Sequence, residues 1–125
     1  MSRNQATLQV LELADQVLAL GKADPVGLAR LVRGLHDLAH VRRGASPPTV
    51  VINMMRPSLG WKERDVDSTL RRLTGLSSAS FLPFDQASLD QALMSGRTPR
   101  STSPSSPFVA RVEVLAKQLA RTTAV

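Results

Sequence analysis

The stretch Val50-Val51-Ile52-Asn53-Met54-Met55-Arg56-Pro57 decides the fold, because an apolar run stops there at polar residues and a proline. Further along the chain, Phe81-Leu82-Pro83-Phe84-Asp85 repeats the pattern. Short apolar runs of this kind are typical of strands that are buried on both faces of a parallel sheet. Ligands bind at the carboxyl ends of such strands. We therefore expect Asn53 and the Pro83-Phe84-Asp85 element to lie side by side at one edge of a sheet.

Strand and helix patterns alternate on both sides of this stretch. Besides 49–55, strands are predicted over 17–20, ended by Gly21, and over 78–82. One helix is predicted to begin after the N-cap Asp24, at Pro25, and to end near the basic loop at Arg42. Further helices are predicted over 7–15, 62–74, 86–95 and 106–121. Strands separated by helices indicate right-handed βαβ units. The expected fold class is α/β, a three-layer arrangement with a partial parallel sheet of about three strands and about five helices.

Apolar residues at three- and four-residue spacing predict the buried face of each helix. Gly75 and Gly96 are expected as C-caps. The predicted inward positions are Leu8, Leu11 and either Val10 or Ala14 in the first helix; Leu28, Leu31, Val32, Leu35, Leu38 and Ala39 in the second; Val66, Leu70 and Leu73 in the third; and Val109, Val112, Leu115, Ala116 and Leu119 in the last.

The chain reads as a single partial domain over 1–125, with a Pro/Ser-rich surface loop at 97–107. Three strands make a thin layer for an α/β protein, and an exposed apolar sheet edge is a liability. We therefore infer that strands of the complete sheet are missing from this sequence.

Composition excludes several classes of function. The chain has 42% hydrophobic and 3% aromatic residues, and the absence of cysteine excludes disulfides, thiol catalysis and cysteine-ligated zinc. The net charge of +6 predicts weak attraction to nucleic acid or acidic partners, although a solvated arginine-rich surface is the alternative. The candidate contacts are Arg42, Arg43, Arg71, Arg72, Arg97, Arg100, Arg111, Lys117 and Arg121.

No apolar run approaches the ~18–20 residues that span a bilayer, and residues 1–5 contain no apolar segment of signal-peptide type. The sequence therefore predicts a cytoplasmic protein without a transmembrane segment.

Two other patterns are rejected as sites. Gly21-Lys22 lacks the rest of G-x-x-x-x-G-K-[ST], since Gln16 and Ala23 stand where glycine and a hydroxyl residue are needed. His36 and His40 share a helix face, but no third metal ligand accompanies them. We expect no catalytic and no metal-binding residue in this chain.

Asn53 and Asp85 are candidate ligand-binding residues. A side-chain amide can pair bidentately with the N6/N7 edge of adenine, although asparagine is also a common residue at a strand's end. Asp85 either caps the following helix or faces a nucleotide.

The ordered set Val-Val-Ile-Asn-x-x-Arg, a helix, Phe-Leu-Pro-Phe-Asp and Gln-Ala-Ser-Leu-Asp-Gln-Ala-Leu-x-x-Gly-Arg resembles the carboxyl half of MinD/ParA-type P-loop ATPases. Ser106-Pro107-Phe108-Val109 fits the family's ending, and the nearest group is the actinobacterial one related to Flp-pilus assembly and septum-site ATPases. The resemblance runs from about Thr7 to Ala120 and implies ATP or ADP as ligand, with Asn53, Arg56, Pro83, Phe84 and Asp85 lining the base pocket.

The family's phosphate-binding loop and magnesium aspartates belong to an amino half that this sequence lacks. The resemblance therefore implies a truncated ATPase fragment that binds nucleotide weakly and does not hydrolyse it alone, with Mg²⁺ only if another chain supplies a P-loop half. Such a P-loop-bearing chain, a homodimer and nonspecific DNA are the implied partners. The alternatives are a small basic module that binds DNA or a partner ATPase, and a structural remnant without a ligand.

Overall fold

The computed structural model describes residues 3–57, 60–76 and 78–123. Its sheet has three parallel strands in the order β1-β2-β3, namely β1 (Leu18–Lys22), β2 (Thr49–Met55) and β3 (Ser80–Pro83). The described helices are α1 (Arg3–Leu13), α2 (Pro25–Val41), α3 (Glu63–Thr74), α4 (Gln86–Ser95), α5 (Pro99–Thr102) and α6 (Pro107–Thr123). The expected α/β class with a partial parallel sheet is confirmed.

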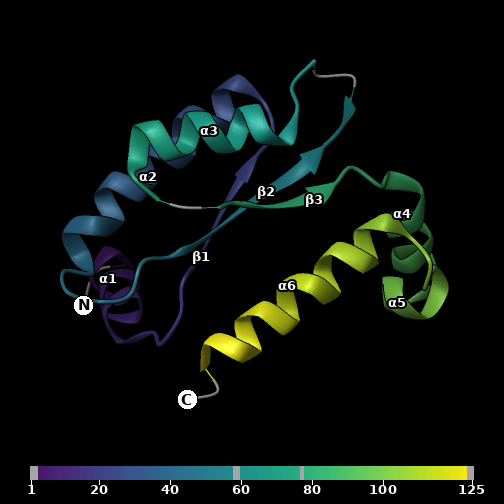
Figure 1. Cartoon of the computed structure of the whole chain (residues 1–125). Coiled ribbons are helices and arrows are strands. Elements are labelled where there is room, and N and C mark those ends of the chain that lie inside the picture. The colour runs from purple at the N-terminus through teal and green to yellow at the C-terminus, as the bar shows by residue number, and fades with distance from the viewer. Residues whose placement is uncertain (1–2, 58–59, 77, 124–125) are drawn as a thin grey trace.

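The sheet is the middle of three layers (Figure 1). Helices α2 and α3 lie over one face, and α6 crosses the opposite face. The strand register pairs Leu20 with Val51 and Ile52 with Phe81. Because successive side chains point to opposite faces, Ile52 and Phe81 point toward α2 and α3, whereas Leu20 and Val51 point toward the α6 side.

The main core fills the face under α2 and α3. Ile52 is 0% exposed, and Val50 and Phe81 are buried beside it. Leu31 and Leu35 of α2, with Val66 and Leu70 of α3, complete this cluster. The burial of these two leucines of α2, and of the valine and leucine of α3, is therefore as their three- and four-residue spacing predicted.

The opposite face has a smaller core. Val51, Leu82 and Leu115 are buried there, with Phe108 and Leu119 half-buried around them. Helix α6 covers β2 and β3, while on β1 the side chains of Leu18 and Leu20 are 42% and 58% exposed.

Helix ends follow the capping residues in the sequence. Asp24 is extended, and its Oδ1 accepts a hydrogen bond of 2.6 Å from the Gly27 amide at the start of α2. Gly75 and Gly96 end α3 and α4 in the left-handed conformation that glycine adopts without strain. The Ser106 hydroxyl accepts from the Val109 amide at 3.0 Å and caps α6.

Five residues that were predicted to point inward are exposed, and those expectations were wrong: Leu8, Ala39, Leu73, Val112 and Ala116. Leu73 is 49% exposed because the chain turns at Gly75, after which Leu76 packs against the core instead. Val112 is 37% exposed because α6 packs on the sheet through Leu115, with Phe108 and Leu119 beside it, and Val112 lies outside that cluster. Ala116, also on α6, is exposed.

Several boundaries also differ from expectation. Helix α1 runs from Arg3 to Leu13 instead of over 7–15, and β3 runs from Ser80 to Pro83 instead of over 78–82. Strand β1 continues through Gly21 to Lys22 instead of ending at the glycine. The 97–107 segment contains α5, whose first residues are held by the Thr98 hydroxyl, and it ends at the buried Ser106. Helix α1 exposes Leu8 and Val10, so its apolar residues are not part of a core. Among the described helices, none combines the length and apolar composition needed to cross a bilayer.

Candidate functional site

The backbone of β2 is irregular where the strand ends. The pairing of β2 with β3 shifts between Ile52 and Met55, and Met54 has a φ of 60°. A non-glycine residue in the left-handed region is uncommon and strained, and strain of this kind clusters at functional sites. The stretch that opened the sequence analysis therefore forms a bulge at the carboxyl edge of the sheet, where ligands of α/β proteins bind.

Asn53 lies at the start of this bulge and is half-buried. Its Oδ1 accepts a hydrogen bond from the Met54 amide at 2.9 Å, and its backbone carbonyl accepts from the Ala23 amide at 3.0 Å. Within the described residues, the Nδ2 group has no hydrogen-bond partner. The side chain is therefore held in one orientation while its donor end stays available.

Arg56, Pro83 and Phe84 come together just beyond the bulge. Met55 pairs with Pro83 in the ladder, and its carbonyl accepts a hydrogen bond of 2.8 Å from the Phe84 amide. The Arg56 guanidinium carbon stands 5.4 Å from the centroid of the Phe84 ring, which is cation–π geometry. The two strand ends thus bring a guanidinium cation over the face of an aromatic ring.

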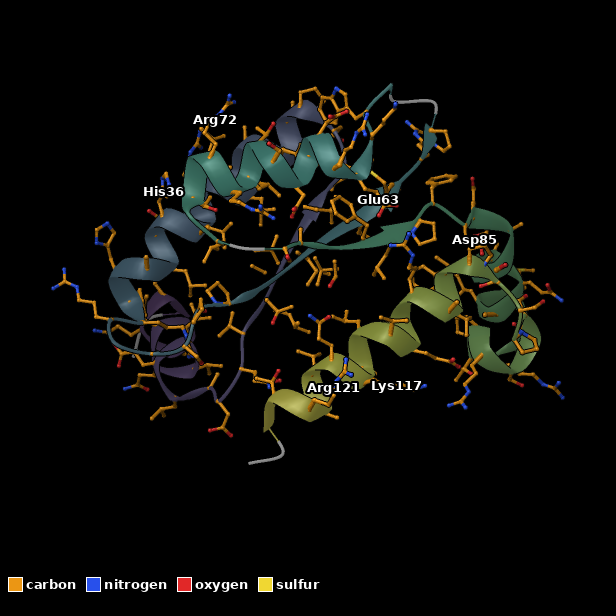
Figure 2. The ribbon with its side chains drawn as sticks, in the orientation of Figure 1. His36, Glu63, Arg72, Asp85, Lys117 and Arg121 are labelled. Carbon is orange, nitrogen blue, oxygen red and sulfur yellow. The ribbon has the colours of Figure 1, made fainter. Side chains whose placement is uncertain are left out.

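Asp85 follows Phe84 in the chain and lies at the start of α4 as its N-cap (Figure 2). Its Oδ1 accepts from the Ser88 amide at 3.2 Å, so the residue caps the helix. Its Oδ2 is buried and has no hydrogen-bond partner among the described residues. No hydrogen bond joins Asp85 to Asn53 in the part of the chain that the structure describes, so the two share an edge of the sheet without touching through polar atoms.

A pocket of about 660 Å³ opens between the end of β2 and the start of α3. That volume lies within the range of small-molecule sites. The sequence analysis missed Trp61, Lys62 and Arg64, which line the pocket, although an indole next to two cations at a helix start was a visible signal. The lining is completed by Met55, Arg56, Pro57, Glu63, Pro83 and Arg111. Of the five residues predicted to line a base pocket, Arg56 and Pro83 line this pocket, whereas Asn53, Phe84 and Asp85 lie outside its lining.

Arg111 forms its contacts with other residues of this chain. Its two terminal nitrogens donate to the two carboxylate oxygens of Glu63 at 3.2 and 3.1 Å, and one of them also reaches the Phe81 carbonyl at 3.3 Å. This bidentate pair joins α6 to α3 across the edge of β3. Arg111 therefore holds two layers together and is a poor candidate for a surface contact.

Three further basic residues of the predicted contact set make internal bonds. Arg42 donates to the carbonyls of Leu11 and Ala14 at the end of α1, at 2.6 and 2.8 Å. Arg71 pairs with Asp67 at 2.9 Å and Arg100 with Glu113 at 3.4 Å.

The other five basic residues make no ion pair with any described residue, and they are Arg43, Arg72, Arg97, Lys117 and Arg121. Arg72 lies at the end of α3, whereas Lys117 and Arg121 lie on α6, on opposite sides of the sheet (Figure 2). The nine predicted residues therefore do not form one continuous basic surface.

Gly21 is explained by packing. A Cβ at Gly21 would stand 2.7 Å from Cδ2 of Leu31, so the glycine lets α2 lie close against β1. His36 is exposed, and its Nε2 lies 3.2 Å from the Leu73 carbonyl at the end of α3. Within the described residues, no group of three potential ligands could hold a metal ion.

No protein-family model matches this sequence, and none of the curated proteins matches it. One solved structure does, the crystal structure of a ParA family ATPase from Chlorobium tepidum TLS, at a TM-score of 0.68 and 18% sequence identity. The match covers 89% of this chain and 45% of that one, so this chain spans less than half the length of the ATPase it is similar to. At this identity the likeness shows a ParA-like fold.

Proposed function

We propose that this chain is the adenine-binding part of a MinD/ParA-like ATPase, in which the carboxyl edge of the sheet holds the base of ATP or ADP. Asn53 supplies an amide for the base, Arg56 and Phe84 supply a stacking surface, and Pro83 and Asp85 complete the rim. The observation that carries this proposal is the strained bulge at Asn53 and Met54, in a fold that is similar to a ParA family ATPase.

The side chains present suit a base better than a triphosphate. The free Nδ2 of Asn53 and the Arg56–Phe84 pair are groups that bind planar heterocycles. The sequence contains no G-x-x-x-x-G-K-[ST] motif whose amides and lysine would surround the phosphates. We therefore propose weak nucleotide binding and no hydrolysis by this chain alone, because phosphoryl transfer depends on positioning and charge stabilisation by such groups.

Magnesium and catalysis would require a P-loop half, which we propose as the chain's partner, with homodimerisation as a further possibility for the complete assembly. The cellular setting that we propose is the cytoplasm of a bacterium, in pilus assembly, division-site placement or chromosome partitioning. These are the processes that the Flp-pilus and septum-site resemblance implies.

Nucleotide binding can be measured with the protein's single tryptophan, because Trp61 lines the pocket next to Arg56. Titration with ADP should change Trp61 fluorescence, and Asn53→Ala should weaken binding by about 2- to 10-fold, the value of one hydrogen bond. Asn4→Ala is the matched control, since Asn4 is exposed on α1. Equal affinity in Asn53→Ala and wild type would refute the proposed base contact.

Hydrolysis is tested by phosphate release from Mg-ATP. The purified chain should release no more phosphate than a blank, whereas turnover that scales with protein concentration would show that residues of this chain suffice for catalysis. A P-loop half supplied in trans should raise the rate above either chain alone.

A second candidate function is that of a small basic module that binds DNA or a partner ATPase. Lys117 and Arg121 on α6 favour it, since they are exposed, form no ion pair with a described residue, and such cations attract phosphates. Duplex DNA should then bind at low salt and dissociate steeply as salt rises. Lys117→Gln with Arg121→Gln should flatten that slope by about two charges. No retention of DNA at low salt removes this candidate.

A further inference from the structure

The outer edge of β1 has no neighbouring strand among the described residues, since the sheet order is β1-β2-β3. The Val17 carbonyl and the Ala23 amide are bonded to β2, at 2.9 and 3.0 Å. In a parallel ladder the backbone groups of alternate residues point to opposite sides. The amides and carbonyls of Leu18 and Leu20 and the amide of Lys22 therefore point outward, ready to pair with another strand.

An apolar groove of about 610 Å³ runs along this edge between β1 and α2. It is lined by Ala19 of β1, by Leu31 and Leu35 of α2, and by Leu8 and Leu11 of α1. Polar atoms lie at the border, where Lys22 pairs with Asp24 at 3.6 Å. A row of unpaired backbone groups beside an apolar groove is the arrangement that accepts an added strand.

Apolar side chains lie on both sides of the outer edge of β1. The groove offers leucines on the α2 side, and Leu18 and Leu20 stand 42% and 58% exposed on the α6 side. A strand buried on both faces is the kind found inside parallel sheets. Gly34 faces the groove with nothing within 4 Å of the position of a Cβ, which leaves space for close approach of another backbone.

We propose that this edge and groove dock a parallel, apolar β-strand from the half of the ParA-like fold that this chain does not span. The ParA family structure supports that occupant, because 89% of this chain superimposes on only 45% of it. The inference rests on the proposed function for the partner's identity. It specifies the contact surface, which lies apart from the base site at Asn53.

The probe is the segment of the Chlorobium tepidum ParA family ATPase that this chain does not match, produced together with the full chain. A complex should form in which the amides of Leu18, Leu20 and Lys22 exchange slowly with solvent. In the chain alone these amides should exchange fast, while the inward-facing amides of Ala19 and Gly21 are protected.

Gly34→Gln fills the groove without disturbing the core, because the position is open. It should weaken the complex at least about tenfold, as overpacking of a fitted surface does. Ala29→Gln is the matched control, since Ala29 is an exposed α2 residue outside the groove. Circular dichroism should show equal helix content in both variants.

Each alternative result overturns the proposal. These results are failure of the two segments to associate, a complex whose β1 amides stay unprotected, and equal affinity of Gly34→Gln and wild type. A homodimer with protected, antiparallel β1 edges would assign the surface to a second copy instead. Asn53→Ala should leave the complex intact, so loss of base binding and loss of docking are separate failures.

Discussion

The two faces of the sheet carry the same kind of apolar side chains but are covered to very different extents. Under α2 and α3, Ile52 is 0% exposed, Val50 and Phe81 beside it are buried, and Ala19 of β1 is half-buried. On the other face, α6 buries Val51 and Leu82, while Leu20, which pairs with Val51 in the ladder, remains 58% exposed. The difference shows that this chain's own helices cover the α2/α3 face except at the groove beside β1, whereas on the other face the side chains of β1 stay exposed.

The largest effect is expected on the α2/α3 face of the sheet. Ile52→Ala should reduce the free energy of unfolding by about 3 kcal/mol, because it removes fully buried methyl groups and leaves a cavity. Urea denaturation followed by circular dichroism measures this loss. A loss below about 1 kcal/mol would mean that this face is loosely packed and that the two faces do not differ as described.

A substitution on the α6 face of the sheet should lower the free energy of unfolding by less. Leu115→Ala is expected to cost about 2 kcal/mol, since the side chain packs against Val51 and Leu82 but its surroundings can relax into solvent. The same denaturation experiment applies, with protease cleavage within α6 as a second readout. A cost equal to that of Ile52→Ala would show that α6 completes its side of the sheet.

A substitution that relieves the backbone strain in the bulge should raise the free energy of unfolding instead of lowering it. Met54→Gly is expected to stabilise the fold by about 1 kcal/mol, because glycine adopts a φ of 60° without the steric cost that methionine pays. Met55→Gly is the matched control and should destabilise, since Met55 is buried in the main core. ADP affinity should fall in Met54→Gly if the strain serves to hold Asn53 in place.

A smaller gain is expected beside the β1 edge. Gly34→Ala should stabilise the chain by about 0.5–1 kcal/mol, because alanine favours helix and the position has open space around it. Thermal unfolding measures the gain. Destabilisation instead would mean that the groove is closed in solution by another part of the molecule.

The smallest effect on stability is expected at Leu20, the more exposed of the two β1 leucines. Leu20→Thr should change the unfolding free energy of the isolated chain by less than about 0.5 kcal/mol, since Leu20 is already in contact with water. In a complex that covers β1, the same substitution should become costly. A large cost in the isolated chain would show that Leu20 is already covered there.

Local sequence patterns were sufficient to predict most of the helices and strands. Strand β2 and helix α4 begin and end where the apolar run, Asp85 and Gly96 predicted. Leu73 and Val112 were misplaced because periodicity marks an apolar stripe without showing where the neighbouring layer ends. Arg42 and Arg111 looked like surface cations, because bonds to carbonyls and carboxylates distant in sequence leave no local pattern.

The candidate site, too, was predicted in part from the sequence and in part only from the structure. The order of Asn53, Pro83 and Asp85 along the chain predicted a ligand edge, because parallel strands bring their carboxyl ends together. The position of Arg56 over the Phe84 ring, the left-handed Met54 and the Trp61 pocket depend on how β2 and β3 shift past each other, which sequence spacing does not specify.

By itself, the sequence determined the alternation of strands and helices, their caps and the parallel α/β class, since these follow from periodicity and local hydrogen bonding. Only the tertiary structure decided which faces are covered, which arginines form bonds within the chain, and that β1 has no neighbouring strand on its outer side among the described residues. Those properties arise from contacts between segments far apart in the chain, whose energies depend on geometry and not on residue type alone.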